Sequence, residues 1–511
     1  MPSENSELSR PQLVPRFNAR ALKKVIMANH EHRETPPPDG RFHASRGILL
    51  TQGLRLAVRV VTAAGLARLV SPADYGIFGM AAFVHGLAYV IQDFGLASVT
   101  LRKASLPDDE RTALFWLNAA AGATLALVVA ALGPLAAVFF GEPLLAKLLP
   151  ILAVTLALNG LHAQLRVQLG REHRFAELNR IEIVAFIVSS GAALLAGWLG
   201  GGSWALATLP LSAELLIAVG VWRAQAWRPG VWPRGFSPRA SLAFGAGISG
   251  HEILRYLQRN ADQFFVGRWF GSGALGLYGR GVQLVVLPGQ YLSDPLATWV
   301  IASLGRAHDA PAAARAFWCR VVNGLAHLTL PMAVVLFSVP GEILRIAFGP
   351  AWVGGAGILR GLSVGLVAQP ILAALTWLLI ATGHGRRLLW WSGATLVTVV
   401  VACAITLHLN PTALSYAASG ALLGATVGGA IFAMGGLPAG PRDLLGAVAR
   451  PAVATVFAVV MTNAALSLAA ASGASLRLGI GGAVVAVSWA MGCAAPGFRE
   501  ELKSHFLRRQ P

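Results

Sequence analysis

Cysteine is scarce in this sequence: the 511 residues include only Cys319, Cys403 and Cys493. A disulfide framework needs several regularly spaced cysteines, and a zinc site needs closely spaced Cys or His ligands. Neither pattern is present here. We therefore expect no disulfide framework and no bound metal.

Charged residues are also few, at 13% of the chain against 55% hydrophobic residues. Soluble globular proteins lie well outside this balance. The formal net charge is +18, but the basic residues interrupt apolar segments instead of forming the surface runs typical of nucleic-acid-binding proteins. The composition predicts an all-α polytopic membrane protein and excludes nucleic acid as a partner.

Catalytic signatures are missing as well. We find no convincing Ser/His/Asp or paired-carboxylate constellation, and no lysine follows Gly200-Gly-Gly-Ser203 to make a phosphate loop. Every loop between apolar segments is short, which leaves no room for a catalytic domain. We therefore predict a transporter with no catalytic residues and no cofactor.

Apolar segments of membrane-spanning length recur along the whole chain, separated by Gly, Pro and charged residues. We expect about 14 transmembrane helices, near residues 47–69, 75–100, 112–140, 146–168, 179–200, 203–222, 241–267, 275–304, 316–339, 355–382, 388–408, 412–436, 443–469 and 475–495.

The loops alternate in charge, because most of the 41 Lys and Arg residues fall in every second loop and in both terminal segments. Short cytoplasmic loops collect positive charge, so both termini are expected in the cytoplasm. The predicted domains are a basic tail (1–46), an N-lobe of six helices (47–222), a linker (223–240), a C-lobe of six helices (241–436), two extra helices (437–495) and a C-terminal tail (496–511).

An internal repeat appears when the chain is shifted by 200 residues. The shift places Leu54, Arg55, Arg59, Arg68, Gly76 and Gly79 on Leu254, Arg255, Arg259, Arg268, Gly276 and Gly279. Because each copy holds an even number of helices, the copies enter the membrane in the same orientation. Parallel repeats predict two lobes around a central cavity, related by a pseudo-two-fold axis along the membrane normal.

The second copy carries a polar stripe formed by Glu252, Arg255, Arg259 and Asp262, which share one helix face. Intramembrane charges are costly and mark functional sites by default. Arginines bind phosphate oxygens bidentately, so Arg55, Arg59, Arg255 and Arg259 could line a diphosphate site. The alternative is that Glu252–Arg255 and Arg259–Asp262 are self-neutralising structural pairs.

Further candidates are less specific. The secondary substrate path comprises Arg68, Arg268, Arg280 and Arg360, each of which could instead anchor an interface. Asp93 and Asp294 occupy matching places in the two copies and, with Glu252 and Asp262, are candidates for gating or for coupling to a proton or sodium gradient. Helix capping is the alternative for Asp93 and Asp294, and His85 is more often a packing residue than a relay.

Several short motifs resemble the Wzx-type polysaccharide flippases of the multidrug/oligosaccharidyl-lipid/polysaccharide exporter superfamily. They are Leu66–Phe78 (LARLVSPADYGIF), Asp93–Leu96 (DFGL), Arg259–Arg268 (RNADQFFVGR), Leu275–Gly281 (LGLYGRG) and Phe348–Trp352 (FGPAW). Their order and spacing carry the resemblance, which runs through nearly the whole membrane region.

The resemblance implies alternating access in the bacterial inner membrane. The implied cargo is an undecaprenyl-diphosphate-linked oligosaccharide moved from the cytoplasmic to the periplasmic leaflet for O-antigen, exopolysaccharide or capsule synthesis. Membrane lipids, a polysaccharide polymerase and glycosyltransferases are the implied partners. A lipid II flippase of the MurJ type, a multidrug antiporter and a membrane glycosyltransferase remain as alternatives.

Overall fold

The computed structural model describes residues 41–93, 107–234, 239–306, 310–468 and 473–493, and every regular element in these ranges is helical. The chain divides into two compact units, residues 1–57 and residues 58–511. Nearly all of both expected lobes falls in the second unit. The expected lobe and tail boundaries stay predictions.

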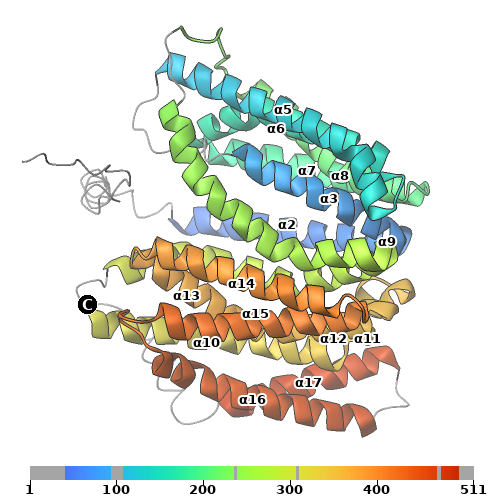
Figure 1. Cartoon of the computed structure of the whole chain (residues 1–511), viewed down its shortest axis with the longest axis vertical. Helices are drawn as coiled ribbons and strands as arrows, with labels where there is room; N and C mark the ends of the chain where they lie inside the picture. Colours follow the sequence, from blue (N-terminus) through green and yellow to red (C-terminus); the bar gives the residue numbers. More distant parts are fainter. Residues whose placement is uncertain (1–40, 94–106, 235–238, 307–309, 469–472, 494–511) are drawn as a thin grey trace, which may run out of the picture. The chain divides into compact units, whose positions relative to one another are not determined.

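Figure 1 shows the helices, coloured in chain order. The first half contains α2 (Arg41–Leu69), α3 (Pro72–Asp93), α5 (Asp108–Phe140), α6 (Leu145–Arg171), α7 (Phe175–Trp198) and α8 (Ser203–Ala224). The second half contains α9 (Arg239–Arg306), α10 (Pro311–Ser338), α11 (Pro340–Ala347), the 3₁₀ helix η2 (Pro350–Gly355), α12 (Ala356–Gly365), α13 (Gln369–Ala381), α14 (Gly385–Thr406), α15 (Pro411–Ala433), α16 (Pro441–Leu468) and α17 (Ala474–Cys493).

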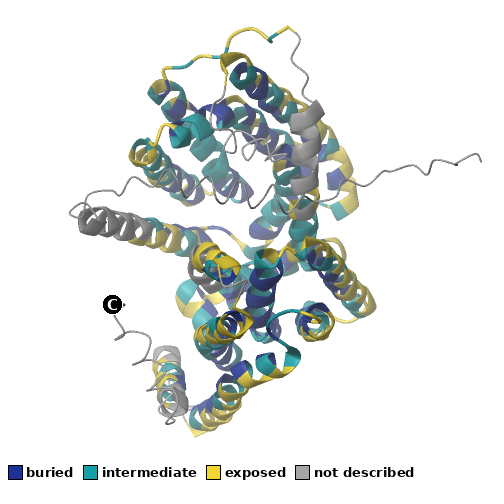
Figure 2. Cartoon of the chain, turned by 90° about the vertical axis from the view of Figure 1, so that its left-hand side faces the viewer, coloured by how far each residue is buried: buried dark blue, intermediate teal, exposed yellow. Residues whose placement is uncertain are grey.

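The surface of these helices is apolar to a degree that water would not tolerate. Val138, Phe432 and Leu468 are 83%, 77% and 92% exposed, and buried and exposed residues share the same helices (Figure 2). Large exposed apolar patches mark contact with lipid or with a partner. Within the described residues, 10 helical segments are long and apolar enough to cross a membrane. The protein is a multi-pass integral membrane protein.

Each of the 14 expected segments overlaps a helix, but α2, α9 and α17 are not among those 10. Helix α2 and the first half of α9 carry the charged residues that make the predicted repeat polar, which lowers their hydropathy. The expected span 355–382 is also interrupted, because α12 ends at Gly365 and α13 begins at Gln369. The count of 14 transmembrane helices therefore stays a prediction.

Helix α9 contains a break where the sequence predicts a turn between two helices. Gly271 has φ +81° and ψ −179°, a conformation that a residue with a Cβ atom rarely adopts. The expected segments 241–267 and 275–304 are thus the two halves of α9. No loop separates the two halves, because the chain changes direction at the single residue Gly271.

The second half of α9 crosses α3 at a reciprocal contact that supports the internal repeat. A Cβ atom on Gly76 would lie 1.7 Å from the carbonyl oxygen of Ser272, and one on Gly276 would lie 1.8 Å from the carbonyl oxygen of Pro72. The shift of 200 residues exchanges the members of these two contacts. Such self-complementary contact is the property of a two-fold interface.

Two turns repeat the same backbone geometry in the two halves. The α6–α7 turn closes with Arg174 N donating to Leu169 O at 3.0 Å, and the α13–α14 turn with His384 N donating to Leu379 O at 2.8 Å. The residues at positive φ are His173 at 57° and Gly383 at 75°. Both turns thus end their helices with the same left-handed cap.

Candidate substrate cavity

A cavity of about 1080 Å³ lies within the second unit. Its lining residues come from α2, α3, α7, α8, α9 and the helices α12 to α15. The volume is at the upper end of the range typical of ligand sites in proteins. It is large enough for a sugar-sized headgroup.

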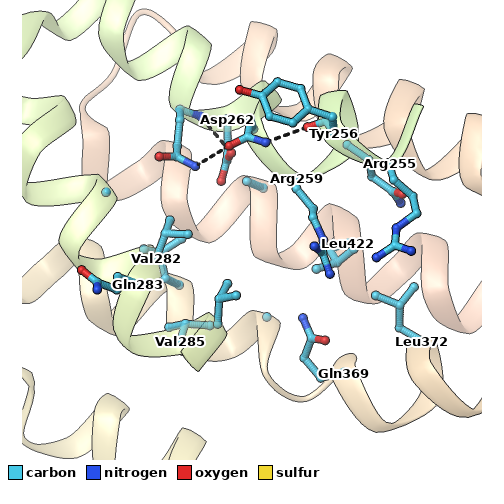
Figure 3. A pocket seen from close by; sticks show the side chains of 18 of the residues that line it. Arg255, Tyr256, Arg259, Asp262, Val282, Gln283, Val285, Gln369, Leu372 and Leu422 are labelled. Atoms are coloured by element: carbon cyan, nitrogen blue, oxygen red, sulfur yellow. Dashed lines mark hydrogen bonds between the residues drawn. The ribbon is translucent and has the colours of Figure 1, made fainter. Parts of the chain in front are cut away.

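One wall of the cavity is cationic. Arg59 reaches it from α2, and Arg255, Arg259 and Arg280 reach it from α9, whereas Asp262 is the only acidic residue among the lining residues that the structure describes. Figure 3 shows the guanidinium groups of Arg255 and Arg259 pointing toward the wall that carries Gln369 and Leu372. An excess of positive over negative charge in a concave, low-dielectric site creates an electric field that attracts anions.

The opposite wall is neutral and carries hydrogen-bonding side chains. Helices α13 and α14 contribute Gln369, Thr376, Ser392 and Thr395, together with the aromatic rings of Trp377 and Trp391. Hydroxyl and amide groups beside aromatic rings suit a polar, uncharged ligand. The cavity therefore offers two chemically different faces.

Asp262 is held by the other half of its own helix. Its carboxylate accepts hydrogen bonds from the Tyr278 hydroxyl and the Gln263 backbone N–H, each at 2.8 Å. Tyr278 is fully buried and lies beyond the break at Gly271. Asp262 thus ties the two halves of α9 together at the cavity wall.

Glu252 pairs with Arg255 as the spacing predicts, at 3.6 Å. Their side chains are 47% and 43% exposed, so this pair contributes little to stability. Glu252 is not a lining residue. The pair leaves Arg255 available to the cavity, since a loose, half-exposed contact is easily exchanged.

Arg280 lines the cavity and packs against aromatic rings. Its guanidinium carbon lies 3.8 Å from the centroid of the Tyr75 ring and 5.6 Å from that of Phe348, and the group contacts Gln283. Stacking of this kind holds a guanidinium group in place without neutralising it.

Three of the sequence motifs meet in one region, which we call the motif joint (Leu66–Phe78, Leu275–Gly281 and Phe348–Trp352). Trp352 is fully buried, donates from Nε1 to Ala67 O at 2.7 Å, and meets the Tyr75 ring edge-on with centroids 5.2 Å apart. Leu66, Tyr75 and Arg280 also line the cavity. The motif joint therefore forms part of the cavity wall.

Arg68 serves the motif joint and not the cavity lining. Its guanidinium donates to Ile346 O at 2.8 Å, at the C-terminal turn of α11, where a cation also interacts favourably with the helix dipole. The Gly200–Ser203 turn is likewise structural, since Ser203 donates from its backbone N–H and its hydroxyl to the Asp74 carboxylate.

The remaining predicted residues lie elsewhere. Arg268 stacks on Phe139 and Trp269, and Arg360 donates from Nε to Phe337 O at 3.0 Å; neither lines the cavity. Arg55 is in the first unit. The side chains of Asp93 and Asp294 lie outside the described residues.

A second group of polar side chains, on α3, α6 and α8, was not predicted from the sequence. His162 of α6 and Glu214 of α8 form a buried pair at 2.7 Å, and His85 contacts Thr155 of α6 at 2.6 Å. The sequence pattern that could have indicated this group is the helical spacing of polar residues on α6. One face of that helix carries Thr155, Asn159, His162 and Arg166. The part of the chain that the structure describes contains no group of three or more His, Cys, Asp or Glu side chains that could hold a metal ion.

A family model described as "Polysaccharide biosynthesis protein" matches residues 65–356, which is more than half of the chain and includes all the sequence motifs of the motif joint. The chain belongs to this family. Similar proteins include the lipopolysaccharide biosynthesis protein WzxC of Escherichia coli, which is 23% identical over 289 residues that cover 56% of this chain and 59% of that protein.

Two further relatives extend the range of organisms. The teichuronic acid biosynthesis protein TuaB of Bacillus subtilis is 22% identical over 61% of this chain and 65% of its own length. The succinoglycan biosynthesis transport protein ExoT of Rhizobium meliloti is 23% identical over 66% of this chain and 68% of its own length. The chain thus spans under two thirds of the first two relatives.

The fold is similar to that of solved transporters. The lipid II flippase MurJ in an inward closed conformation matches with a TM-score of 0.68 at 12% identity, over 89% of this chain and 99% of MurJ. An inward-facing multidrug transporter of the MATE family matches with a TM-score of 0.55 at 15% identity, over 77% of this chain and 98% of its own. At these identities the likeness concerns the fold alone.

Proposed function

We propose that this family member is a flippase that moves undecaprenyl-diphosphate-linked oligosaccharide from the cytoplasmic to the periplasmic leaflet of the bacterial inner membrane. The carrying observation is the cavity with one arginine wall and one neutral, hydrogen-bonding wall inside a multi-pass membrane protein. A lipid-linked sugar diphosphate has the same two chemical parts. The transport protein ExoT and the biosynthesis protein WzxC among the relatives support the same pathway.

The diphosphate is assigned to Arg59, Arg255 and Arg259. Guanidinium groups remain charged in any protein environment and bind phosphate oxygens in pairs, which makes them suited to an anion that leaves water for the membrane interior. The sugars are assigned to the face formed by Gln369, Thr376, Ser392 and Thr395, since uncharged, hydroxyl-rich groups gain hydrogen bonds with amide and hydroxyl side chains there.

Alternating access is proposed to proceed by movement of two parallel six-helix lobes with α16 and α17 as the added pair. The motif joint lies at the ends of helices expected to be periplasmic, so it is proposed to close the cavity on that side and to open when the cargo leaves. Asp262 at the break in α9 is proposed as a gating residue, because it joins two helix halves that must move if the cavity opens on the other side.

The proposed transport can be tested by measuring which lipid-linked intermediate accumulates when the protein is depleted. Depletion of the protein in its own host should cause lipid-linked oligosaccharide of the surface polysaccharide to accumulate in the cytoplasmic leaflet, while lipid II stays at its normal level. Selective accumulation of lipid II would replace this proposal with the lipid II flippase alternative. Sugar transfer by the purified protein in detergent, with no membrane to cross, would instead indicate a glycosyltransferase.

Purified protein in proteoliposomes provides the direct measurement. Lipid-linked oligosaccharide extracted from the depleted cells should become accessible to an added glycosidase faster in vesicles containing the protein than in empty vesicles. Equal rates would contradict the proposal.

A further inference from the structure

Tyr256 lies between two arginines of α9 that line the cavity and packs against α3. Its side chain is turned around the helix by about 100° from Arg255 and by about 60° from Arg259. In Figure 3 its ring extends in a different direction from the two guanidinium groups. The hydroxyl is shared between two backbone carbonyls of α3, Phe83 O at 2.8 Å and Ala82 O at 3.2 Å. Tyr256 therefore connects the arginine face of α9 to a neighbouring helix.

Gly86 provides the space that this contact needs. It lies one turn after Ala82 on α3, and a Cβ atom there would lie 2.5 Å from the hydroxyl oxygen of Tyr256 and 3.0 Å from two carbons of its ring. Non-bonded carbon atoms approach one another to about 3.5 Å, so a larger residue at position 86 would displace the ring. We call Gly86 and the carbonyls of Ala82 and Phe83 the tyrosine notch.

Apolar packing leaves this part of the contact between α3 and α9 incomplete. The ring of Phe83 lies 6.0 Å from that of Tyr256 and 5.2 Å from that of Phe264, measured between centroids. Beside these rings, a void of about 80 Å³ is bordered by Ala82, Phe83, Asn260 and Phe264. Atoms that line a void lose packing contacts on one side. The hydroxyl of Tyr256 therefore adds a directional contact where packing is weakest.

The direction of the two arginines depends on the rotation of α9 about its axis. Arg255 and Arg259 are one turn apart, so a rotation moves both guanidinium groups together. The ion pair of Glu252 with Arg255 is long and half-exposed, and it restrains this rotation little. The contact of Asp262 with Tyr278 joins the two halves of α9 to each other and not to α3. The tyrosine notch is suited to fix the rotation, because it holds α9 against another helix.

We propose that Tyr256 is a positioning residue for the diphosphate of the cargo, which rests on the proposed flippase function. Seated in the tyrosine notch, it fixes the rotation of α9 at which Arg255 and Arg259 face the same anion. Its hydroxyl acts through these arginines and does not contact the diphosphate. Two phosphate groups engage both guanidinium groups, whereas a single phosphate can be bound by one arginine whatever the position of the other.

Selectivity between two lipid phosphates tests this role. The full-length protein in lipid nanodiscs is titrated with undecaprenyl diphosphate and with undecaprenyl monophosphate, and the ratio of the two dissociation constants is measured. The wild type should prefer the diphosphate, and Tyr256→Phe should reduce that preference by about threefold to tenfold, the range expected for one neutral hydrogen bond. The ratio does not depend on the fraction of folded protein, so a general loss of stability would leave it unchanged.

A second variant and two matched controls accompany Tyr256→Phe. Gly86→Ala should lower the ratio in the same way, because the added methyl group displaces the ring from the tyrosine notch. Gly191→Ala adds a methyl group on α7, where it would meet no neighbouring helix within 4 Å, and should leave the ratio unchanged. Tyr416→Phe removes a tyrosine hydroxyl from α15, outside the cavity lining, and should also leave it unchanged.

The outcomes separate the positioning role from the proposed function. A wild type that prefers the diphosphate, together with an unchanged ratio in Tyr256→Phe, overturns the role of Tyr256 and leaves the flippase function in place. An equal loss of the ratio in Tyr416→Phe also overturns it. A wild type without preference for the diphosphate removes the assignment of the diphosphate to the arginines, and the role of Tyr256 falls with it.

Discussion

The arginines of this protein fall into two groups that look alike in the sequence and differ in the structure. Arg59, Arg255 and Arg259 line the cavity. Arg68 and Arg360 instead donate hydrogen bonds to backbone carbonyl groups, Arg268 stacks on an aromatic ring, and none of these three lines the cavity. Both groups interrupt apolar helices, and each contains one pair related by the repeat, Arg59 with Arg259 and Arg68 with Arg268. The difference shows that intramembrane charge marks an important residue without telling whether it binds cargo or holds helices together.

The largest expected effect comes from the cavity group. Arg255→Ala and Arg259→Ala should each reduce transport by about 30-fold or more, because truncating one partner of a desolvated charge contact costs roughly 2–5 kcal/mol. Surface polysaccharide should be lost while protein level and membrane insertion stay unchanged. The matched control is Arg268→Ala, which removes the same side chain from the same helix outside the cavity. Retained polysaccharide in Arg259→Ala would remove the arginine wall from the mechanism.

Arg280 lies at the border between the two groups, so its effect should be intermediate. Arg280→Lys keeps the charge and loses the planar stacking on Tyr75, which should lower transport by about tenfold and stability by roughly 1–2 kcal/mol. Tyr75→Ala should reproduce the loss of stability, measured by thermal unfolding in detergent. Tyr75→Phe should be nearly neutral, since its buried hydroxyl has no partner. Equal effects of Tyr75→Ala and Tyr75→Phe would exclude the stacking role.

Arg68 tests the other group. Arg68→Ala should lower the free energy of unfolding by about 0.5–1.5 kcal/mol through loss of the exposed hydrogen bond to Ile346, while transport per folded molecule stays unchanged. Thermal unfolding and vesicle assays normalised to protein content separate the two quantities. A strong loss of transport at normal stability would place Arg68 on the cargo path instead.

The smallest effect is expected at Glu252. Glu252→Gln removes a long, half-exposed ion pair and should change stability by no more than about 0.5 kcal/mol. Transport should be unchanged or slightly faster, because Arg255 loses its competitor for the cargo. A transport loss as large as that of Arg255→Ala would show that the pair acts as a unit.

The sequence was informative about helices and about the repeat. Helices can be located because apolar runs of spanning length are a local property. The shift of 200 residues paired Gly76 with Gly276 as equivalent positions, and their meeting at one crossing became visible only in the structure. The division of the arginines could not be predicted, since it depends on contacts as distant as Arg68 with Ile346. The partner of Asp262 was also out of reach, because Tyr278 becomes a neighbour only through the conformation of Gly271.

The buried pair of His162 and Glu214 is another contact between distant residues that the sequence does not predict. Its members are 52 residues apart and lie on two different helices. Helical spacing along α6 places His162 on a polar face, but nothing local selects Glu214 as the group opposite. Packing of α6 against α8 makes that choice.

The crossing of α3 with the second half of α9 has a consequence for the origin of the molecule. The first copy presents the Pro72 carbonyl and Gly76, and the second copy presents the Ser272 carbonyl and Gly276 at the equivalent positions, so each glycine meets the carbonyl of the other copy. A chain with a single copy could form the same contact twice with an identical chain. The crossing is the interface that a symmetric homodimer would use. Fusion of two such chains would let each copy change independently. The sequence shows such a difference, because Gln52 and Thr62 are the positions in the first copy that correspond to Glu252 and Asp262 in the second.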